Sequence, residues 1–311
     1  MIAPMQFSVP LFPYDRWGSV EAIAEVAELA DELGIGALQF PDHVIMPVFE
    51  GRPDVSVVWH DNFVLGAYLA ARTRRLRFIF NVLVVPYRPP VLLAKLISTL
   101  DTVSQGRLTL GIGAGWLRGE FRVLGVPFAE RGALTDEYLR AMKVLWTEER
   151  PSFEGRTIRF SGIAFEPRCV QQPHVPLWIG GSGPAPLRRA LELGDGWSPM
   201  VGELAELAPE VARMKERLAA RGRDPARFAF NSSISFGAPD ALRETARRHA
   251  SHAGERTESN APSSPEAIVE LIGRYREAGF TNLTLSFGWE KPADYLRQLE
   301  WLAANVLPKL R

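Results

Sequence analysis

The stretch that decides the fold runs from Leu76 to Trp116 and reads LRFIFNVLVVPYRPPVLLAKLISTLDTVSQGRLTLGIGAGW. An apolar, β-branched run at Leu76–Val84 is followed by a segment of helical period at Pro90–Val103 and by a second apolar run at Arg107–Ile112. Strand, helix and strand in this order form a βαβ unit, the building block of a parallel sheet. The same alternation extends in both directions along the chain.

Eight such strands are expected in the 311 residues. Besides the two above, they are Gln6–Phe12, Ala37–Phe40, Pro176–Ile179, Gly196–Met200, Phe228–Phe236 and Asn282–Phe287. One-sided apolar stripes typical of amphipathic helices separate them, at Ser19–Leu33, Asn62–Arg72, Pro90–Val103, Leu134–Trp146, Leu187–Leu193 and Asp294–Val306. Eight strands with intervening helices fit either a doubly wound open sheet or a (β/α)8 TIM barrel.

The positions of the glycine-rich turns separate these two folds. A doubly wound sheet usually carries such a turn after its first strand, but here the first strand ends in Val-Pro-Leu-Phe-Pro. The glycine-rich turns follow the fourth and fifth strands instead, at Gly111–Gly115 and Gly180–Gly183. We therefore expect one α/β domain over residues 1–311, a TIM barrel with its site and its insertion loops at the C-terminal face.

Three longer segments are expected to be insertions, because long loops in a compact domain are usually functional or disordered. Residues 46–59 follow the second strand and are a candidate lid. Residues 152–168 alternate apolar and polar side chains around Glu154 and Gly155, which predicts a surface hairpin. Residues 253–264 are rich in Ser, Glu, Asn and Pro and are expected to be mobile.

Composition favours small-molecule chemistry. Lys plus Arg and Asp plus Glu both total 36, so no global field attracts nucleic acid or an anionic membrane. No apolar run reaches the roughly 18 residues of a membrane helix, and the single cysteine, Cys169, excludes an intrachain disulfide. We expect a cytoplasmic protein with no nucleic-acid or membrane partner. We interpret His249 and His252 as a solvent-exposed pair on a helix and not as a zinc site.

Candidate catalytic residues follow the second strand. Asp42 and His43 place a carboxylate and an imidazole that titrates near neutrality at the mouth of the barrel. The alternative is a purely structural role, in which Asp42 caps a backbone turn and His43 only forms hydrogen bonds within the protein. Asn81 lies inside an apolar strand and needs a polar partner if it points into the barrel.

Candidate binding residues lie in the two glycine-rich turns. Gly180, Gly181, Ser182 and Gly183 precede Pro184, a suitable first helical residue, so free backbone N–H groups can face a phosphate. A left-handed glycine turn that binds nothing is the alternative. The turn at Gly113, Ala114 and Gly115 offers bare backbone to a planar ring, although a tight strand-to-helix turn would use the same residues. Aromatic residues near the strand ends are candidates for a substrate pocket: Phe12, Trp17, Trp59, Trp116 and Trp289.

With these residues the sequence resembles the luciferase-like monooxygenase superfamily, and especially its branch dependent on the deazaflavin coenzyme F420. The resemblance extends almost from end to end. Its motifs are Asn81-Val-Leu-Val-Val-Pro-Tyr-Arg-Pro-Pro, Ser104-x-Gly106-Arg107, Gly111-x-Gly-x-Gly-Trp116, Leu124-Gly-Val-Pro-Phe-x-Glu-Arg131, Pro176-x-Trp178-Ile-Gly-Gly-Ser-Gly183 and Leu193-Gly-Asp-Gly-Trp197.

The resemblance implies duties for the matching positions. Asp42 and His43 would contact the polar edge of the ring or move a proton, and Asn81–Val82 would form a bulge, often with a cis peptide, against one face of the ring. The backbone of Gly113–Gly115 would run alongside the ring or its ribityl chain, and Gly180–Gly183 would bind the phosphate. A homodimer is also implied.

The resemblance leaves the cofactor open between coenzyme F420, used for hydride transfer to or from a small organic substrate, and reduced FMN (FMNH2), used by a monooxygenase with a flavin reductase partner. F420 carries extra carboxylates, for which Arg52, Arg88 and Arg118 are candidate partners. Members that oxidise a sugar phosphate have glutamate at the position of Trp116, so that substrate is not expected. A catalytically silent flavin-binding barrel is a further alternative.

Overall fold

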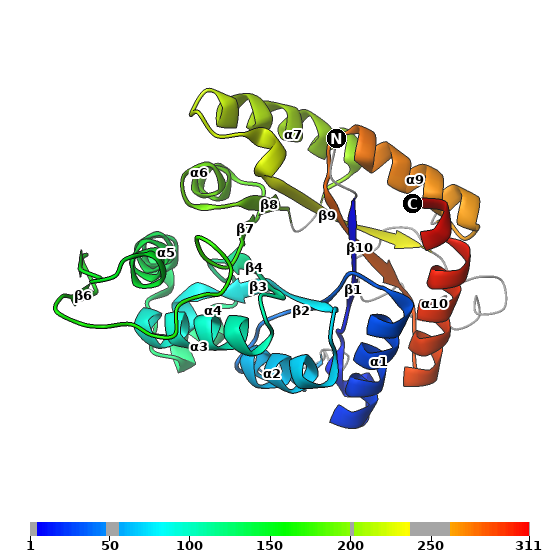
Figure 1. The fold of residues 1–311 in the computed structure, drawn as a ribbon, viewed down its shortest axis with the longest axis horizontal. Coiled ribbons are helices and arrows are strands. Elements are labelled where there is room, and N and C mark those ends of the chain that lie inside the picture. Colours follow the sequence, from blue (N-terminus) through cyan, green and yellow to red (C-terminus); the bar gives the residue numbers. More distant parts are fainter. Residues whose placement is uncertain (1–4, 48–55, 200–201, 237–261, 311) are drawn as a thin grey trace.

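In this computed structural model the chain is described over residues 5–47, 56–199, 202–236 and 262–310. Eight parallel strands close into a barrel in the order β1–β10–β9–β8–β7–β4–β3–β2, with helices around it (Figure 1). The strands are β1 (Gln6–Pro10), β2 (Ala37–Phe40), β3 (Arg77–Val84), β4 (Leu108–Gly113), β7 (Leu177–Gly180), β8 (Gly196–Ser198), β9 (Ala229–Phe236) and β10 (Asn282–Phe287). The (β/α)8 TIM barrel is confirmed.

Nine α-helices are described. They are α1 (Val20–Leu33), α2 (Asn62–Arg72), α3 (Pro90–Val103), α4 (Arg118–Val123), α5 (Arg131–Thr147), α6 (Pro184–Leu193), α7 (Leu204–Ala219), α9 (Pro265–Glu277) and α10 (Pro292–Asn305). Short 3-10 helices lie at Tyr14–Arg16, Val85–Tyr87, Phe128–Glu130, Pro225–Arg227 and Leu307–Leu310. The short helix α4, which proves important for the site, had no counterpart among the expected ranges.

Local chemistry sets the helix ends. The Ser19 hydroxyl accepts from the backbone N–H of Ala22 at 3.1 Å, which caps the start of α1. Gly34 ends the same helix in the left-handed region at φ 74°, a conformation that costs glycine little. Pro184 is the first residue of α6, as expected from its position after the glycine turn.

The core lies between the barrel and its helices. Phe80, on β3, is fully buried and meets the rings of Phe40 and Phe63 edge to face at centroid distances of 5.6 and 5.3 Å. Such packing fixes β2 and β3 against α2, so the residues that follow these two strands are held on a rigid base.

The predicted hairpin is present. Strands β5 (Phe153–Glu154) and β6 (Arg159–Phe160) pair antiparallel and project beside α5 (Figure 1). The Glu137 carboxylate on α5 anchors the turn by accepting from the backbone N–H groups of Thr157 and Ile158. The centre of the candidate lid, 48–55, most of the expected mobile insertion, 253–261, and the histidines at 249 and 252 lie outside the described residues.

Candidate active site

The histidine that follows β2 is held by a buried glutamate. His43 Nδ1 lies 2.8 Å from Glu120 Oε2, and the side chain of Glu120, on α4, is 0% exposed. An ionised carboxylate only accepts hydrogen bonds, so Nδ1 carries the proton and Nε2 is left as an acceptor. Among the described residues, Nε2 of His43 has no hydrogen-bond partner. The geometry gives His43 a defined tautomer with one nitrogen free for chemistry.

Glu120 accepts three further hydrogen bonds. Tyr87 donates its hydroxyl at 2.5 Å, and the backbone N–H groups of Val44 and Ile45 donate at 2.6 and 3.2 Å. Burial by itself would raise the pKa of Glu120, but the hydrogen bonds from His43, Tyr87 and Val44 outweigh it and lower that pKa. Burial and the neighbouring carboxylate both raise the pKa of Tyr87. Glu120 is therefore a stable anion that can balance a positive charge on His43.

Asp42 is occupied by structural contacts. Its Oδ2 accepts from the backbone N–H of Val84 and from Arg88 Nη1, both at 2.9 Å, and its Oδ1 accepts from Arg88 Nη2 at 2.9 Å. Arg88 also reaches Asp61, the N-cap of α2, at 3.2 Å. Asp42 thus ties the ends of β2 and β3 to α2. Its proposed contact with a cofactor or a proton stays a prediction.

The third strand carries the bulge that the resemblance implied. The peptide between Asn81 and Val82 is cis, and the register between β3 and β4 shifts between Phe80 and Leu83. Glycines on β4, next to β3, and on β7, one strand further along the barrel, make room for it. A Cβ at Gly113 would lie 2.6 Å from Val82 Cγ2, and a Cβ at Gly180 would lie 2.7 Å from Val82 Cγ1. These two glycines therefore seat Val82, a duty that the sequence analysis did not foresee.

A chain of hydrogen-bonded side chains crosses the barrel interior at the level of Asn81. The amide of Asn81 donates to Gln39 Oε1 at 3.3 Å and accepts from the Ser198 hydroxyl at 3.3 Å. The chain continues on both sides, with Gln39 donating to Ser8 and Thr284, and Asn231 donating to Ser198. Asn81 thus points inward and has found its partners. This layer forms the floor of the mouth.

The turn before α6 can receive an anion. Gly181 adopts φ 100°, and its backbone N–H donates to Ser198 O at 3.3 Å, which fixes the turn to β8. The next N–H groups, of Ser182 and Gly183, have no partner among the described residues and lie at the N-terminus of a ten-residue helix. Free N–H groups and the helix dipole together favour a phosphate at this place.

The predicted aromatic residues divide into two groups. Trp59 stacks on Phe12 at a centroid distance of 4.9 Å and meets His43 edge to face at 4.5 Å, while Trp116 is 68% exposed with its centroid 6.2 Å from His43. The rings of Trp59 and Trp116 flank the imidazole, and Phe12 extends this aromatic wall through Trp59. Trp17 and Trp289 are buried, with their ring centroids 4.2 Å apart, so their place in a substrate pocket stays a prediction.

The remaining candidates are placed as follows. The guanidinium of Arg88 is committed to Asp42 and Asp61, Arg118 lies over the ring of Phe128 at 4.5 Å, and Arg52 is outside the described residues. Within the described ranges, no cluster of three potential metal ligands occurs and no helix is long and apolar enough to span a membrane. Cys169 is buried, and burial raises the pKa of its thiol to about 12.

Comparison with known proteins identifies the family. The sequence profile of the luciferase-like monooxygenases matches residues 8–268. The chain belongs to this family. The F420-dependent glucose-6-phosphate dehydrogenase of Kineococcus radiotolerans is 28% identical in an alignment of 327 positions, gaps included, that covers 93% of each chain. The FMNH(2)-dependent dimethylsulfone monooxygenase of Pseudomonas putida is 31% identical over 166 residues, 52% of this chain and 46% of that one.

The fold comparison agrees with the family assignment. The crystal structure of the monooxygenase RslO1 from Streptomyces bottropensis superposes with a TM-score of 0.81 at 24% identity, covering 99% of this chain and 100% of that one. The luciferase-like barrel, with its site at the C-terminal strand ends, is therefore the frame for the residues above. The relatives are oxidoreductases that differ in their cofactor.

Glu120 and Tyr87 are the site residues that the sequence analysis missed. Both lie on short helices after β4 and β3, and neither helix was expected. The available signal was an acidic side chain beside Phe121 in an otherwise ordinary stretch after the glycine turn. Only the fold brings that carboxylate to His43, 77 positions away in the sequence.

Proposed function

We propose that this chain is an F420-dependent oxidoreductase that passes a hydride between the deazaflavin and a small organic substrate. The observation that carries the proposal is the ordered His43–Glu120 pair among aromatic rings at the strand ends, with the Val82 bulge on the adjacent strand β3. The relative that aligns over 93% of both chains is F420-dependent, which supports the same cofactor here.

The residues of the mouth fit a flavin-like group. Ser182 and Gly183 present free N–H groups for the phosphate, and Val82, seated on glycine, offers an apolar contact for one face of the ring. The bound deazaflavin would supply the hydride chemistry, which no side chain can perform. Phe12, Trp59 and Trp116 would exclude water and position a ring-bearing or apolar substrate.

His43 would move the proton that accompanies hydride transfer to or from a carbonyl carbon. Its Nε2 accepts the proton when an alcohol is oxidised and returns it when a ketone is reduced. Glu120 keeps the opposite nitrogen protonated and balances the imidazolium charge, as a buried carboxylate does in other histidine-based sites. The intact pair also argues against a catalytically silent barrel.

A monooxygenase that uses FMNH2 is the second candidate. The similarity to the dimethylsulfone monooxygenase favours it, although that match spans about half of each chain. Phosphate and ribityl chain are common to both cofactors, so the turn before α6 would serve either. An FMN enzyme would need a flavin reductase as a partner.

The test replaces His43 with Gln and follows F420 affinity and turnover separately. Turnover is the oxidation of reduced F420 by a panel of aromatic and aliphatic ketones and enones, or the reverse with secondary alcohols. We expect at least a 100-fold loss of turnover with F420 affinity changed less than threefold, because general acid–base catalysis contributes roughly 10²–10⁴-fold. Equal losses of both would assign His43 to binding and would contradict the proposal.

We also propose a homodimer. Helices α2 and α3 expose Val64, Val91 and Leu92, and the side chain of Val64 is 73% exposed. Burying such apolar surface between two copies is a common basis of homodimer interfaces. Light scattering on the purified protein should give twice the 34.6 kDa of one chain, and a Val64→Glu variant should give the monomer mass.

A further inference from the structure

A hollow lies at the opposite end of the barrel from the candidate active site. It measures about 770 Å³ and is lined by the first residues of the strands, including Gln6–Ser8 on β1, Ala37 on β2, Arg77 and Ile79 on β3, and Ala229 on β9. Ligand pockets typically have about 300–1,000 Å³, whereas protein interiors hold few voids larger than a water molecule. The hollow has the size of a small-molecule site.

The polar layer of the mouth separates this cavity from the active site. Gln39, Asn81 and Asn231 belong to that layer, and each comes two residues after a cavity-lining residue of the same strand: Ala37, Ile79 and Ala229. Side chains two apart on a strand face the same side, one level higher. The cavity is therefore a site of its own below the floor of the mouth.

The inner wall of the cavity is apolar. Ala37, Ile79 and Trp178 form a small buried cluster, with Ala229 packed against it. The two alanines leave space that a larger side chain would fill, and the indole of Trp178 offers a flat surface. This part suits the hydrophobic body of a ligand.

The outer wall is cationic. Arg77, Arg223 and Arg227 line it, and within the described ranges none of them forms a salt bridge with a carboxylate. Arg77 donates to Gly106 O and Gln171 Oε1, both at 3.2 Å, and Arg223 donates to the carbonyls of Leu191 and Gly194 at 2.8 and 2.7 Å. All these acceptors are neutral, so neither guanidinium is hydrogen-bonded to a carboxylate.

The two acidic side chains of the wall have other partners. Asp195 accepts from the backbone N–H of Leu177 at 3.1 Å, and Asp224 caps the turn at Ala226 N at 2.9 Å. His174, also on the wall, lies 3.9 Å from Asp195, and burial lowers its pKa. Burial likewise lowers the pKa of Arg77, against the opposing effect of Asp101. A half-buried guanidinium whose hydrogen bonds go only to neutral acceptors favours an anionic ligand.

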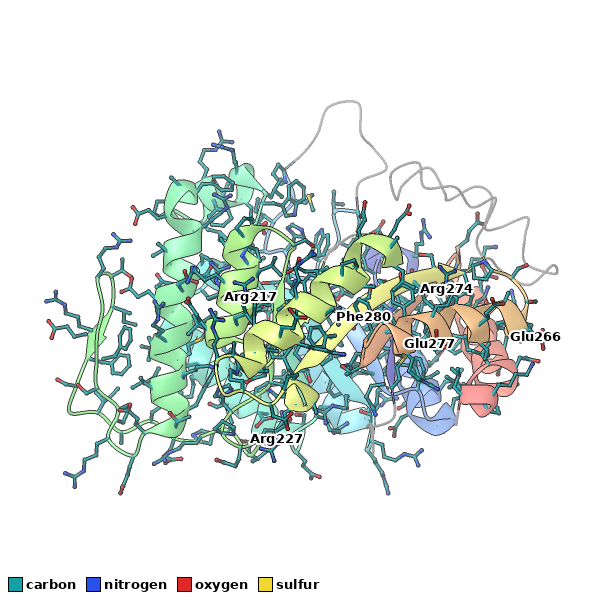
Figure 2. All side chains as sticks on the ribbon, turned by 90° about the horizontal axis from the view of Figure 1, so that it is seen from above. Arg217, Arg227, Glu266, Arg274, Glu277 and Phe280 are labelled. Atoms are coloured by element: carbon teal, nitrogen blue, oxygen red, sulfur yellow. The ribbon has the colours of Figure 1, made fainter. Side chains whose placement is uncertain are left out.

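We propose that the cavity binds an amphiphilic organic anion. Its apolar or aromatic body would lie on Ile79, Trp178 and Ala229, and its carboxylate, sulfonate or phosphate would face Arg77 and Arg223. Arg227 would attract the anion at the rim, and Figure 2 shows it at the lower edge of the molecule, near the start of β9. This site is independent of the proposed deazaflavin site.

The test uses two fluorescent probes that share a ring system. 8-Anilinonaphthalene-1-sulfonate carries a negative charge, and N-phenyl-1-naphthylamine is the same molecule without the sulfonate. Both are titrated into the full-length protein and into Arg77→Gln, Arg223→Gln and Ala229→Leu variants. Arg217→Gln, an exposed arginine of α7 (Figure 2) that does not line the cavity, and Trp116→Ala, at the mouth, are the controls.

We expect the anionic probe to bind at least tenfold more tightly than the neutral one. Each arginine variant and the cavity-filling Ala229→Leu should weaken the anionic probe at least tenfold, while both controls bind as the wild type does. Equal affinity of the two probes, or no loss in Ala229→Leu when its melting curve is that of a folded protein, would overturn the proposal. The proposal would also be overturned if deletion of residues 2–4 increased the affinity for the anionic probe tenfold. That result would mean that the chain's own N-terminal residues compete with the probe for the cavity.

Discussion

The substitution Glu120→Gln should change both the tautomer of His43 and the stability of the fold, because it alters the hydrogen bonds that Glu120 accepts. The carboxylate accepts four hydrogen bonds, from His43, Tyr87 and the N–H groups of Val44 and Ile45. A carboxamide has one acceptor oxygen, which can keep the two backbone donors. Its NH2 group then faces His43 and Tyr87, and two charge-assisted hydrogen bonds are lost.

Each of those bonds is worth about 1.5–3 kcal/mol, and His43 recovers part of this by switching its proton to Nε2 and accepting from the amide. We therefore expect a loss of about 2–4 kcal/mol of folding free energy. Nitrogen-15 NMR of the imidazole should show the Nδ1–H tautomer in the wild type and the Nε2–H tautomer in the variant. Turnover should fall with the tautomer change, because Nε2 no longer accepts a proton.

The pH dependence gives an independent check. The pKa of Glu120 is lowered in the folded protein, so its contribution to stability is present above the ordinary value of 4.5 and is lost as pH falls through the folded pKa. The difference in melting temperature between wild type and variant should shrink in that range. Glu137→Gln, at the hairpin, is the matched control and should leave the tautomer of His43 unchanged. An unchanged tautomer in Glu120→Gln with wild-type stability would show that Glu120 does not set the protonation of His43.

Three further predictions concern other parts of the fold. Arg88→Met leaves the buried Asp42 without its partner and should cost about 3–5 kcal/mol in thermal or urea unfolding; a cost below about 1 kcal/mol would contradict the assigned ion pair. Gly181→Leu places a side chain at a residue with φ 100°, and its Cβ would lie 3.0 Å from Pro186 Cγ. The substitution should weaken the binding of F420 or FMN at least tenfold in a fluorescence titration. Unchanged affinity would exclude this turn as the phosphate site. Cys169 should resist a thiol reagent at pH 8 until the protein unfolds, because burial raises its pKa to about 12; fast labelling of the native protein would argue against that burial.

Much of the fold could be predicted from the sequence because the barrel is built from local signals. The strand at Ala37–Phe40 and the helices at Asn62–Arg72 and Pro90–Val103 have the predicted bounds. The signals that define α1 all lie within a short stretch of sequence. They are the period of its apolar residues, the capping residue Ser19 at its start and Gly34 at its end. The position of the glycine turns was enough to choose the barrel over the open sheet.

The site was less predictable because it depends on contacts between distant segments. His43 and Asn81 stood out as polar residues at or near strand ends, but Glu120 lies on the six-residue helix α4, which has no clear apolar period. The glycines 113 and 180 were recognised, yet their role in seating Val82 follows from the register of three strands. The cationic cavity could not be predicted at all, since its arginines come from a strand and from the loop between α7 and β9.

Binding of a deazaflavin at the mouth of this barrel, the basis of the proposed function, is tested by titrating the purified protein with coenzyme F420 and with FMN, each oxidised and reduced. Protein fluorescence and melting temperature report binding, because a ligand of the folded state stabilises it in proportion to its affinity. We expect F420 to bind at least tenfold more tightly than FMN, and this binding to be lost in Gly181→Leu. A preference for reduced FMN would make the chain a monooxygenase with a reductase partner, and binding of neither cofactor would contradict the proposed function.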